Sequence, residues 1–151
     1  MLQFNELPEG EPYIDRPGSY VIMTREAKLV VVRIIGWGEC FLPGGGIDKG
    51  EQPVEALIRE VREETGYFIT GMEKICEAAE YIYSPTAGAY LNKQGLYYSA
   101  EIIDQDTSFI IEEDHEVLYL PVDKALETLY LDSQKWAVQQ WMNNKNGTTT
   151  K

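Results

Sequence analysis

The chain has 151 residues, of which 44% are hydrophobic and 25% charged, and this composition predicts one globular domain over residues 1–151. Its formal net charge of −12 argues against a long nucleic acid as partner, because such a partner needs a basic surface that displaces counterions. The same charge argues against an anionic membrane surface. A small anionic ligand is compatible with it if a cation or a local group of Lys and Arg offsets the repulsion.

The predicted elements mix strands and helices. Strands are predicted from β-branched and aromatic runs at residues 19–24, 28–35, 40–42, 67–83, 90–103 and 117–120. Helices are predicted from apolar residues at helical spacing and from helix end signals at residues 53–65, 122–130 and 133–142. The first two strands are expected to form a hairpin or to lie side by side, and the two long ones to be antiparallel. This order of elements predicts an α/β fold in which a mixed sheet has helices on both faces.

The two ends of the chain and the cysteines bear on its location. The start MLQFNELPEG has no basic patch and no apolar segment, so no signal peptide is expected. Cys40 and Cys76 are too few for a disulfide framework and are expected to be free thiols. These features predict a cytoplasmic protein. The polar stretch NNKNGTTTK, residues 143–151, is expected to be a flexible tail.

The predicted helix at 53–65 has an unusual acidic face. Pro53 suits its first turn and Gly66 suits the position just past its end. At helical spacing Glu60, Glu63 and Glu64 fall on one face, next to an apolar face rather than opposite it. Like charges at this spacing repel by a few tenths of a kcal/mol per pair, roughly, unless a cation lies among them. The alternative is that the three glutamates form a solvated acidic surface. The apolar face beside them argues against this alternative, because it should leave the acidic face partly enclosed.

A run of three glycines, Gly44 to Gly46, precedes this helix and is expected to be a loop that a ligand can approach closely. A flexible turn is the alternative for the glycines taken alone. Carboxylates and backbone carbonyls together favour a hard cation, Mg²⁺ or Mn²⁺, over zinc. The loop and the acidic face therefore predict a divalent-cation site.

The same residues resemble the signature of the Nudix hydrolases, the family that includes MutT-like nucleotide pyrophosphohydrolases. The matching positions are Gly45, Glu51, Arg59, Glu60, Val61, Glu63, Glu64, Gly66 and Tyr67. Tyr67 stands where the family usually has an aliphatic residue. LPGG at 42–45 and LYLPVDKAL at 118–126 fit the surrounding layout, so the resemblance covers most of the chain.

The resemblance implies an α/β/α sandwich with a mixed sheet, and cleavage of a diphosphate linked to another moiety. It implies that Glu60, Glu63 and Glu64 hold Mg²⁺, or alternatively Mn²⁺, with the carbonyl of Gly45. Glu51 and Arg59 would pair and hold the loop against the helix; an ordinary surface ion pair is the alternative.

The proton acceptor for the attacking water is expected to be Glu63 or Glu64. The resemblance also implies that the base, or a further metal ligand, can come from a loop or strand late in the chain, and the candidates there are Glu112, Glu113 and Glu116. Glu116 is preferred because it leads into the last strand, and each of the three could instead be a solvated loop acid. His115, the only histidine, is expected to be a surface residue and is left out of the site.

The substrate is expected to be a small nucleotide, with nucleoside triphosphates, ordinary or oxidised, favoured over dinucleoside polyphosphates and nucleotide sugars. Tyrosines around the SPTAG turn could stack on a base, although tyrosine is also common in strands. The cations considered for the phosphates are Arg25, Lys28, Arg33 and Lys49. A nucleotide sensor without turnover and a partner-binding acidic helix are the other readings, and the sequence is compatible with a homodimer.

Overall fold

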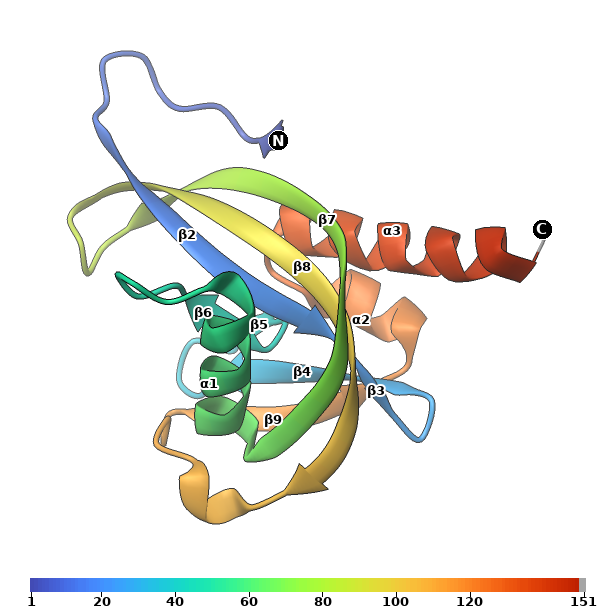
Figure 1. Ribbon diagram of the computed structural model, residues 1–151. Coiled ribbons are helices and arrows are strands. Elements are labelled where there is room, and N and C mark those ends of the chain that lie inside the picture. Colours follow the sequence, from blue (N-terminus) through green and yellow to red (C-terminus); the bar gives the residue numbers. More distant parts are fainter. Residues whose placement is uncertain (150–151) are drawn as a thin grey trace.

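The computed structural model describes residues 1–149 of the chain and the side chains of residues 1–145 (Figure 1). Its strands are β1 (Leu2–Phe4), β2 (Tyr13–Ile22), β3 (Thr24–Arg25), β4 (Lys28–Ile34), β5 (Cys40–Phe41), β6 (Gly44–Gly46), β7 (Tyr67–Ser84), β8 (Ala89–Gln105) and β9 (His115–Leu120). Its helices are α1 (Pro53–Thr65), α2 (Val122–Thr128) and α3 (Asp132–Thr149), with a 3-10 helix at Thr107–Phe109.

The strands form two sheets. A five-stranded mixed sheet has the order β1-β7-β8-β2-β6, with β2 parallel to β8 and antiparallel to β6. A four-stranded antiparallel sheet contains β3, β4 and β5, with β9 on the free side of β4. The predicted antiparallel pair is confirmed in β7 and β8, which curve together across the molecule in Figure 1. Three register shifts along this pair fit the curvature, because bulges bend strands.

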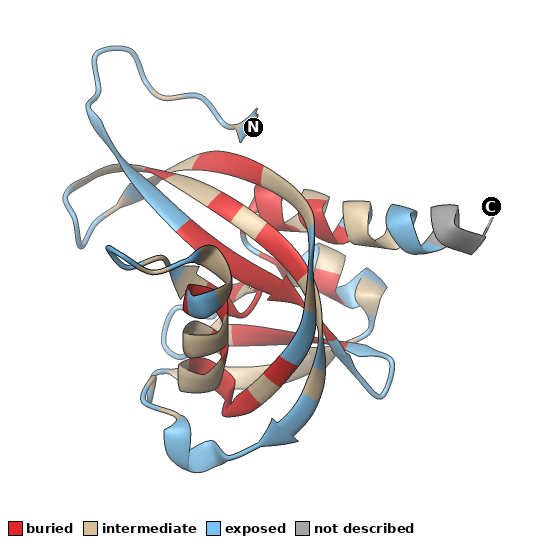
Figure 2. Cartoon of the chain, viewed as in Figure 1, coloured by how far each residue is buried: buried red, intermediate tan, exposed pale blue. Residues whose placement is uncertain are grey.

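Two hydrophobic cores lie among these layers. Successive residues of β2 point to opposite faces, so Tyr20 and Ile22 enter one core and Val21 the other, which Met23, directly after the strand, also enters. This explains why that half of β2 is buried on both sides (Figure 2). Residues of α2 and α3 pack into the first core and residues of α1 into the second. The predicted mixed sheet with helices on both sides is therefore confirmed.

Helix α1 begins and ends at the predicted residues. Pro53 is its first residue, and the side chain of Glu55 accepts a 2.9 Å hydrogen bond from the amide of Gln52, just before the helix. Gly66 ends it with φ 74°, a left-handed conformation that favours glycine. Leu57 and Val61 are fully buried in the second core, and this fixes which helix face turns toward the Gly44–Gly46 strand.

Three details differ from the sequence-based expectation. Gly44–Gly46 is not a loop but strand β6, paired antiparallel with residues 18–20 of β2. The predicted hairpin is confined to β3 and β4, whose two-residue turn has positive φ at Glu26 and Ala27, while β2 runs in the other sheet. Helix α3 runs to Thr149, beyond its predicted end at residue 142, and residues 150–151 of the expected tail lie outside the described residues.

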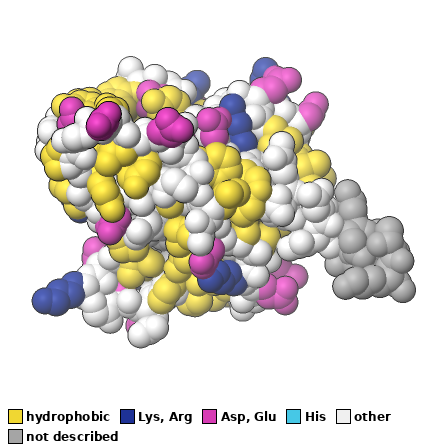
Figure 3. All heavy atoms as spheres, turned by 90° about the horizontal axis from the view of Figure 1, so that it is seen from above, with side chains coloured by type: hydrophobic (Ala, Val, Ile, Leu, Met, Phe, Trp, Pro, Cys, Tyr) yellow, Lys and Arg dark blue, Asp and Glu magenta, His cyan; other side chains and the backbone are white. Residues whose placement is uncertain are grey.

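The surface carries charges of both signs. On the face shown in Figure 3, Lys and Arg side chains lie singly among acidic and hydrophobic ones. Within residues 1–149, no helix is both long enough and apolar enough to cross a membrane.

Candidate active site

Arg59 forms hydrogen bonds with several residues on and beside α1. Its guanidinium donates to both carboxylate oxygens of Glu51, from Nε at 2.7 Å and from Nη2 at 2.9 Å. Nη2 also donates to the carbonyl of Gly46 at 3.1 Å, and Nη1 donates to Glu60 at 2.9 Å and to Glu63 at 3.3 Å. The Glu51–Arg59 pair thus ties the segment after β6 to α1 and simultaneously orients two carboxylates of the acidic face.

A third carboxylate comes from a distant part of the chain. One oxygen of Glu112 lies within 4.8 Å of oxygens of Glu60 and Glu63. The loop that carries Glu112 is bound to the end of α1, because the amides of Ile111 and Glu112 donate to the carbonyl of Glu63 at 3.0 and 3.4 Å. Those backbone bonds are what bring Glu112 to the acidic face.

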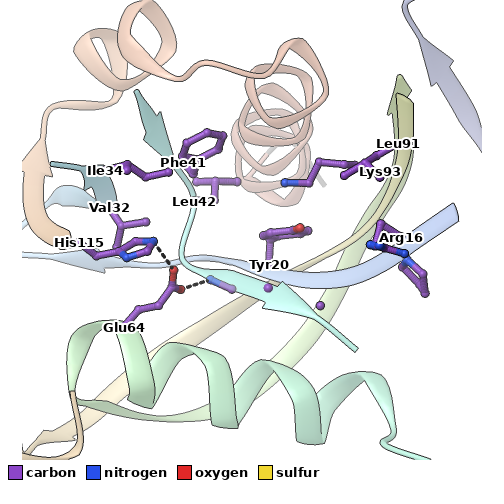
Figure 4. A pocket seen from close by; sticks show the side chains of 14 residues that line it. Arg16, Tyr20, Val32, Ile34, Phe41, Leu42, Glu64, Leu91, Lys93 and His115 are labelled. Carbon is purple, nitrogen blue, oxygen red and sulfur yellow. Dashed lines mark hydrogen bonds and ion pairs between the residues drawn. The ribbon is translucent and has the colours of Figure 1, made fainter. Parts of the chain in front are cut away.

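Glu64 is the most deeply buried carboxylate of the acidic face, and the charges of Glu60 and Glu112 act on it. It is 6% exposed, and its Oε1 accepts a 2.7 Å hydrogen bond from the amide of Gly44 (Figure 4). Its Oε2 lies 3.6 Å from Nε2 of His115. Burial raises the pKa of Glu64 well above its ordinary value, and the Gly44 amide offsets part of that rise.

Gly45 lies directly against Glu60. A Cβ on Gly45 would come within 2.5 Å of the Glu60 carboxylate, so only glycine allows the carboxylate to approach the β6 backbone this closely. Burial also raises the pKa of Glu60, and Arg59 offsets this in part.

These residues fit a hard divalent cation. The clustered donor atoms of Glu60, Glu63 and Glu112 are all oxygens, as Mg²⁺ and Mn²⁺ prefer, and the strand beside them has no side chain to fill the space. Crowded, partly buried carboxylates repel one another, and a bound cation would offset that repulsion.

A cavity of about 310 Å³ opens beside Glu64 and β6, within the range typical of small-ligand sites. Glu64 and His115 lie at one end of it and Arg16 and Lys93 at the other (Figure 4). The wall between these ends is formed by Tyr20, Val32, Ile34, Phe41, Leu42 and Leu91. The cavity therefore offers cations for phosphate groups and an apolar wall for a ring.

Some of the predicted residues lie elsewhere. Glu116 is opposite Arg33 in the β4–β9 pair and forms a 2.6 Å ion pair with it. Because neighbouring strand residues face opposite ways, Glu116 points away from the side on which His115 meets Glu64. Of the three candidate acids, Glu112 is therefore the one that lies beside Glu60 and Glu63, whereas the preferred candidate, Glu116, does not. Arg25 is likewise engaged at another place, where it donates to the hydroxyl of Tyr67 at 2.7 Å.

Three residues of the site were missed. His115 was expected at the surface but is only 16% exposed and lines the cavity. Arg16 and Lys93 were not considered, because neither belongs to a recognisable motif. A partial signal existed for His115, since it directly precedes the predicted last strand. Of the tyrosines near the turn, Tyr97 and Tyr98 are buried in the cores and do not line the cavity.

Comparison with known proteins shows the family of the chain. A family model described as the NUDIX domain matches residues 15–142. A CMP-5'-(N-acetyl-N-hydroxy-3-aminopropyl)phosphonate hydrolase of Streptomyces rubellomurinus is 27% identical over 139 residues, covering 82% of this chain and 63% of that protein. An RNA pyrophosphohydrolase of Brucella anthropi is 51% identical over 85 residues, covering 50% of this chain and 47% of that protein. The chain thus spans about half to two thirds of the length of these relatives.

Solved structures share the fold. A NUDIX hydrolase from Nitrosomonas europaea superposes with a TM-score of 0.69 at 15% identity, covering 87% of this chain and 90% of that one. A MutT protein from Bacillus halodurans superposes with a TM-score of 0.59 at 18% identity, covering 82% and 80%. Since the family model covers most of the chain, the protein belongs to the Nudix family, as its signature residues predict.

Proposed function

We propose that the protein is a divalent-metal-dependent hydrolase that cleaves a phosphoanhydride bond in a nucleoside diphosphate-linked substrate. The observation that carries the proposal is the group of Glu60, Glu63 and Glu112 carboxylates, whose oxygens lie within 4.8 Å of one another at the Gly44–Gly46 strand. The relatives named RNA pyrophosphohydrolase and phosphonate hydrolase support a reaction at phosphorus.

Glu60, Glu63 and Glu112 would hold Mg²⁺, with Mn²⁺ as the alternative, and the carbonyl of Gly45 is a further candidate ligand. When bound, the cation neutralises charge on phosphate oxygens and makes a nearby water more acidic. Arg59 keeps Glu60 and Glu63 in place, because it donates to both of them and is itself held by Glu51.

Arg16 and Lys93 bind the phosphate chain from the far end of the cavity. Water attacks phosphorus, the anhydride P–O bond breaks, and the departing phosphate takes the bonding electrons. We assign the proton from the water to Glu64, whose Oε1 is occupied by the Gly44 amide while Oε2 faces His115 in the cavity. Glu63 is the other carboxylate proposed for this role.

We favour a nucleoside triphosphate, ordinary or oxidised, as the substrate, with its base against Phe41 and Leu91 of the cavity wall. Dinucleoside polyphosphates and nucleotide sugars are the alternatives. We place the protein in the cytoplasm, as expected from the sequence.

Release of phosphate and pyrophosphate across these substrates tests the proposal. Each would be incubated with Mg²⁺, with Mn²⁺ and with a chelator, beside the Glu63→Gln variant. Metal-dependent release that Glu63→Gln loses is the expected result. If none of the substrates released phosphate or pyrophosphate while Mg²⁺ still raised the melting temperature, the result would contradict the hydrolase proposal. It would instead support a nucleotide sensor without turnover.

A further inference from the structure

The short segment between β5 and β6 leads directly into the contact with Glu64. Leu42 in this segment is 1% exposed and lines the cavity (Figure 4). Pro43 follows, and the amide of Gly44 then donates to Glu64. Proline fixes its own φ and restricts the residue before it, so few backbone angles between Leu42 and Gly44 can rotate. A contact that holds Leu42 therefore also influences the direction of the Gly44 amide.

A side chain of α3 holds Leu42. The amide of Leu42 donates a 2.8 Å hydrogen bond to Oε1 of Gln134, which lies 92 residues later in the chain. Gln134 is completely buried and Leu42 almost so, which leaves no room for solvent to replace the bond. A buried amide that loses its acceptor keeps the full cost of its desolvation, so this contact strongly favours one position of the segment.

The Gln134 side chain stands where a neighbouring strand would supply a carbonyl. Two residues before Leu42, the carbonyl of Cys40 accepts a 2.9 Å hydrogen bond from the amide of Tyr130, and Cys40 pairs with Leu129 as an isolated parallel bridge. In a longer parallel pairing the next amide would donate to the next backbone carbonyl. Here the chain turns into α3 instead, and the side-chain oxygen of Gln134 takes over as the acceptor.

Strand β2 holds the segment from another side. The amide of Val21 donates to the carbonyl of Pro43 at 2.9 Å. A trans peptide is planar, with its C=O and N–H pointing in opposite directions. Since the Pro43 carbonyl faces Val21, the N–H of Gly44 points the other way, where it meets Glu64. Val21 thus sets the plane of this peptide, and Gln134 fixes the residue from which the peptide starts.

Gln134 also has an atom that the fold does not use. Its Nε2 is buried and has no hydrogen-bond partner among the residues that the structure describes. A buried donor without a partner costs stability and offsets what the bond to Leu42 contributes. The net gain in stability from Gln134 is therefore small, and what its side chain specifically adds is an acceptor oxygen at Leu42.

We propose that Gln134 is a positioning residue for the hydrolysis. It holds Leu42 so that the Gly44 amide keeps Oε1 of Glu64 in place and leaves Oε2 to the cavity. Gln134 acts through these residues and not on the substrate, since it is not among the described residues that line the cavity. The inference rests on the proposed function, because it takes Glu64 as the group that accepts the proton of the attacking water.

Gln134→Met tests the proposal, because methionine has a similar length and volume but no acceptor oxygen. Because a misplacement of about 1 Å can cost about 100-fold in rate, kcat for a nucleoside triphosphate should fall about tenfold or more. KM should stay within about twofold, since the cations that face the phosphates lie on β2 and β8. Mn²⁺ affinity, measured by isothermal titration, should also stay within about twofold, because Arg59 holds Glu60 and Glu63 from within α1.

Two further variants separate positioning from a loss of stability. Gln134→Glu keeps an oxygen at the same place, and burial favours its neutral form, so kcat should return to within about threefold of the wild type. Val138→Ala is the matched control, because Val138 lies one turn further along α3 and is completely buried in the first core. It should lower the melting temperature about as much as Gln134→Met and keep kcat within about twofold. An equal loss of kcat in Val138→Ala, or an unchanged kcat in Gln134→Met, would overturn the proposal.

Amide hydrogen exchange, followed by NMR, measures the same contact without turnover. The amides of Leu42 and Gly44 should exchange faster in Gln134→Met than in the wild type or in Val138→Ala. Unchanged exchange at Gly44 in Gln134→Met, with hydrolysis by the wild type intact, would overturn the positioning role and leave the proposed function standing. Faster exchange at Gly44 in a protein whose wild type hydrolyses no nucleotide would keep the support of the segment by Gln134 and overturn the proposed function.

Discussion

The amide of Gly44 donates a 2.7 Å hydrogen bond to the carboxylate of Glu64, and this bond joins strand β6 to the interior face of α1. A Cβ on Gly44 would come within 2.1 Å of the carbonyl of Ser19, so the strand can lie this close only with glycine there. The bond fixes one oxygen of Glu64 and leaves the other facing the cavity and His115. One carboxylate of the acidic face is thus held in a fixed orientation by the backbone of β6.

Glu64→Gln should lower kcat about 100-fold or more, because an amide cannot take the proton of the attacking water. The amide oxygen still accepts the bond from Gly44, so the melting temperature should change little. Steady-state kinetics and thermal unfolding check both expectations. Glu127→Gln is the control, since that side chain is 72% exposed on α2. Turnover within about threefold of the wild type would remove Glu64 from the reaction.

Gly45→Ala should disable the site while leaving the fold intact. The new methyl would lie 2.5 Å from the Glu60 carboxylate, and the flexible end of that side chain can move aside at small cost in stability. Because a misplacement of about 1 Å can cost about 100-fold in rate, we expect kcat to fall by roughly that factor. Isothermal titration with Mn²⁺ should show weaker binding.

Gly46→Ala provides the matched control for Gly45→Ala. It lies next along the same strand, and nothing comes within 4 Å of a Cβ placed there. Its activity should stay within about twofold of the wild type. Equal losses in both variants would mean that strand flexibility, and not the approach to Glu60, is what the glycines provide.

The sequence predicted α1 to the residue because its signals are local. Pro53 and Gly66 define its ends, and the spacing of its glutamates defines its acidic face. The position of Glu112, unlike the ends of α1, is not determined by local sequence signals. It depends on backbone hydrogen bonds from residues 111 and 112 to Glu63, which no local pattern encodes. That is why the sequence could name three nearby acids as candidates but could not indicate which of them lies beside Glu60 and Glu63.

Neither the strand conformation of β6 nor the position of Lys93 in the site could be predicted from the sequence, for related reasons. Glycines have no strand propensity of their own, and Gly44–Gly46 pairs only because β2 lies beside it. Lys93 enters the site through the register of β2 with β8, in which Arg16 is opposite Lys93. The parallel register between strands far apart in the chain is a property of the tertiary fold. A search for sequence motifs therefore finds neither Arg16 nor Lys93.

The Glu51–Arg59 pair should make the stability of the folded protein depend on pH in the acid range. The hydrogen bonds from Arg59 lower the pKa of Glu51 to about 2 from an ordinary value of 4.5. A lowered folded-state pKa means that the contribution is present above about pH 4.5 and is lost as pH falls toward 2. Glu51→Gln should therefore melt below the wild type at pH 6, and the difference should shrink across this window.

NMR titration of Glu51 checks the cause of that behaviour. In the wild type its carboxyl should titrate near 2. Arg59→Lys should move the pKa back toward its ordinary value, because an ammonium cannot donate to both oxygens in the same fork. An unchanged pKa in Arg59→Lys would assign the shift to the amide of Asp48, which also donates to Glu51 at 2.8 Å.

Glu112→Gln and Glu116→Gln should behave in opposite ways, although only three residues lie between them in the sequence. Glu112 joins Glu60 and Glu63, so its loss should weaken Mn²⁺ binding and lower kcat about 10- to 100-fold. Glu116 faces Arg33, and the side chains of Arg33 and Glu116 are 42% and 40% exposed. Removing such a pair costs about 0–1 kcal/mol of stability, and activity should stay within about twofold. The reverse result, a silent Glu112→Gln and an inactive Glu116→Gln, would mean that β9 rather than the loop before it supplies the last acid of the site.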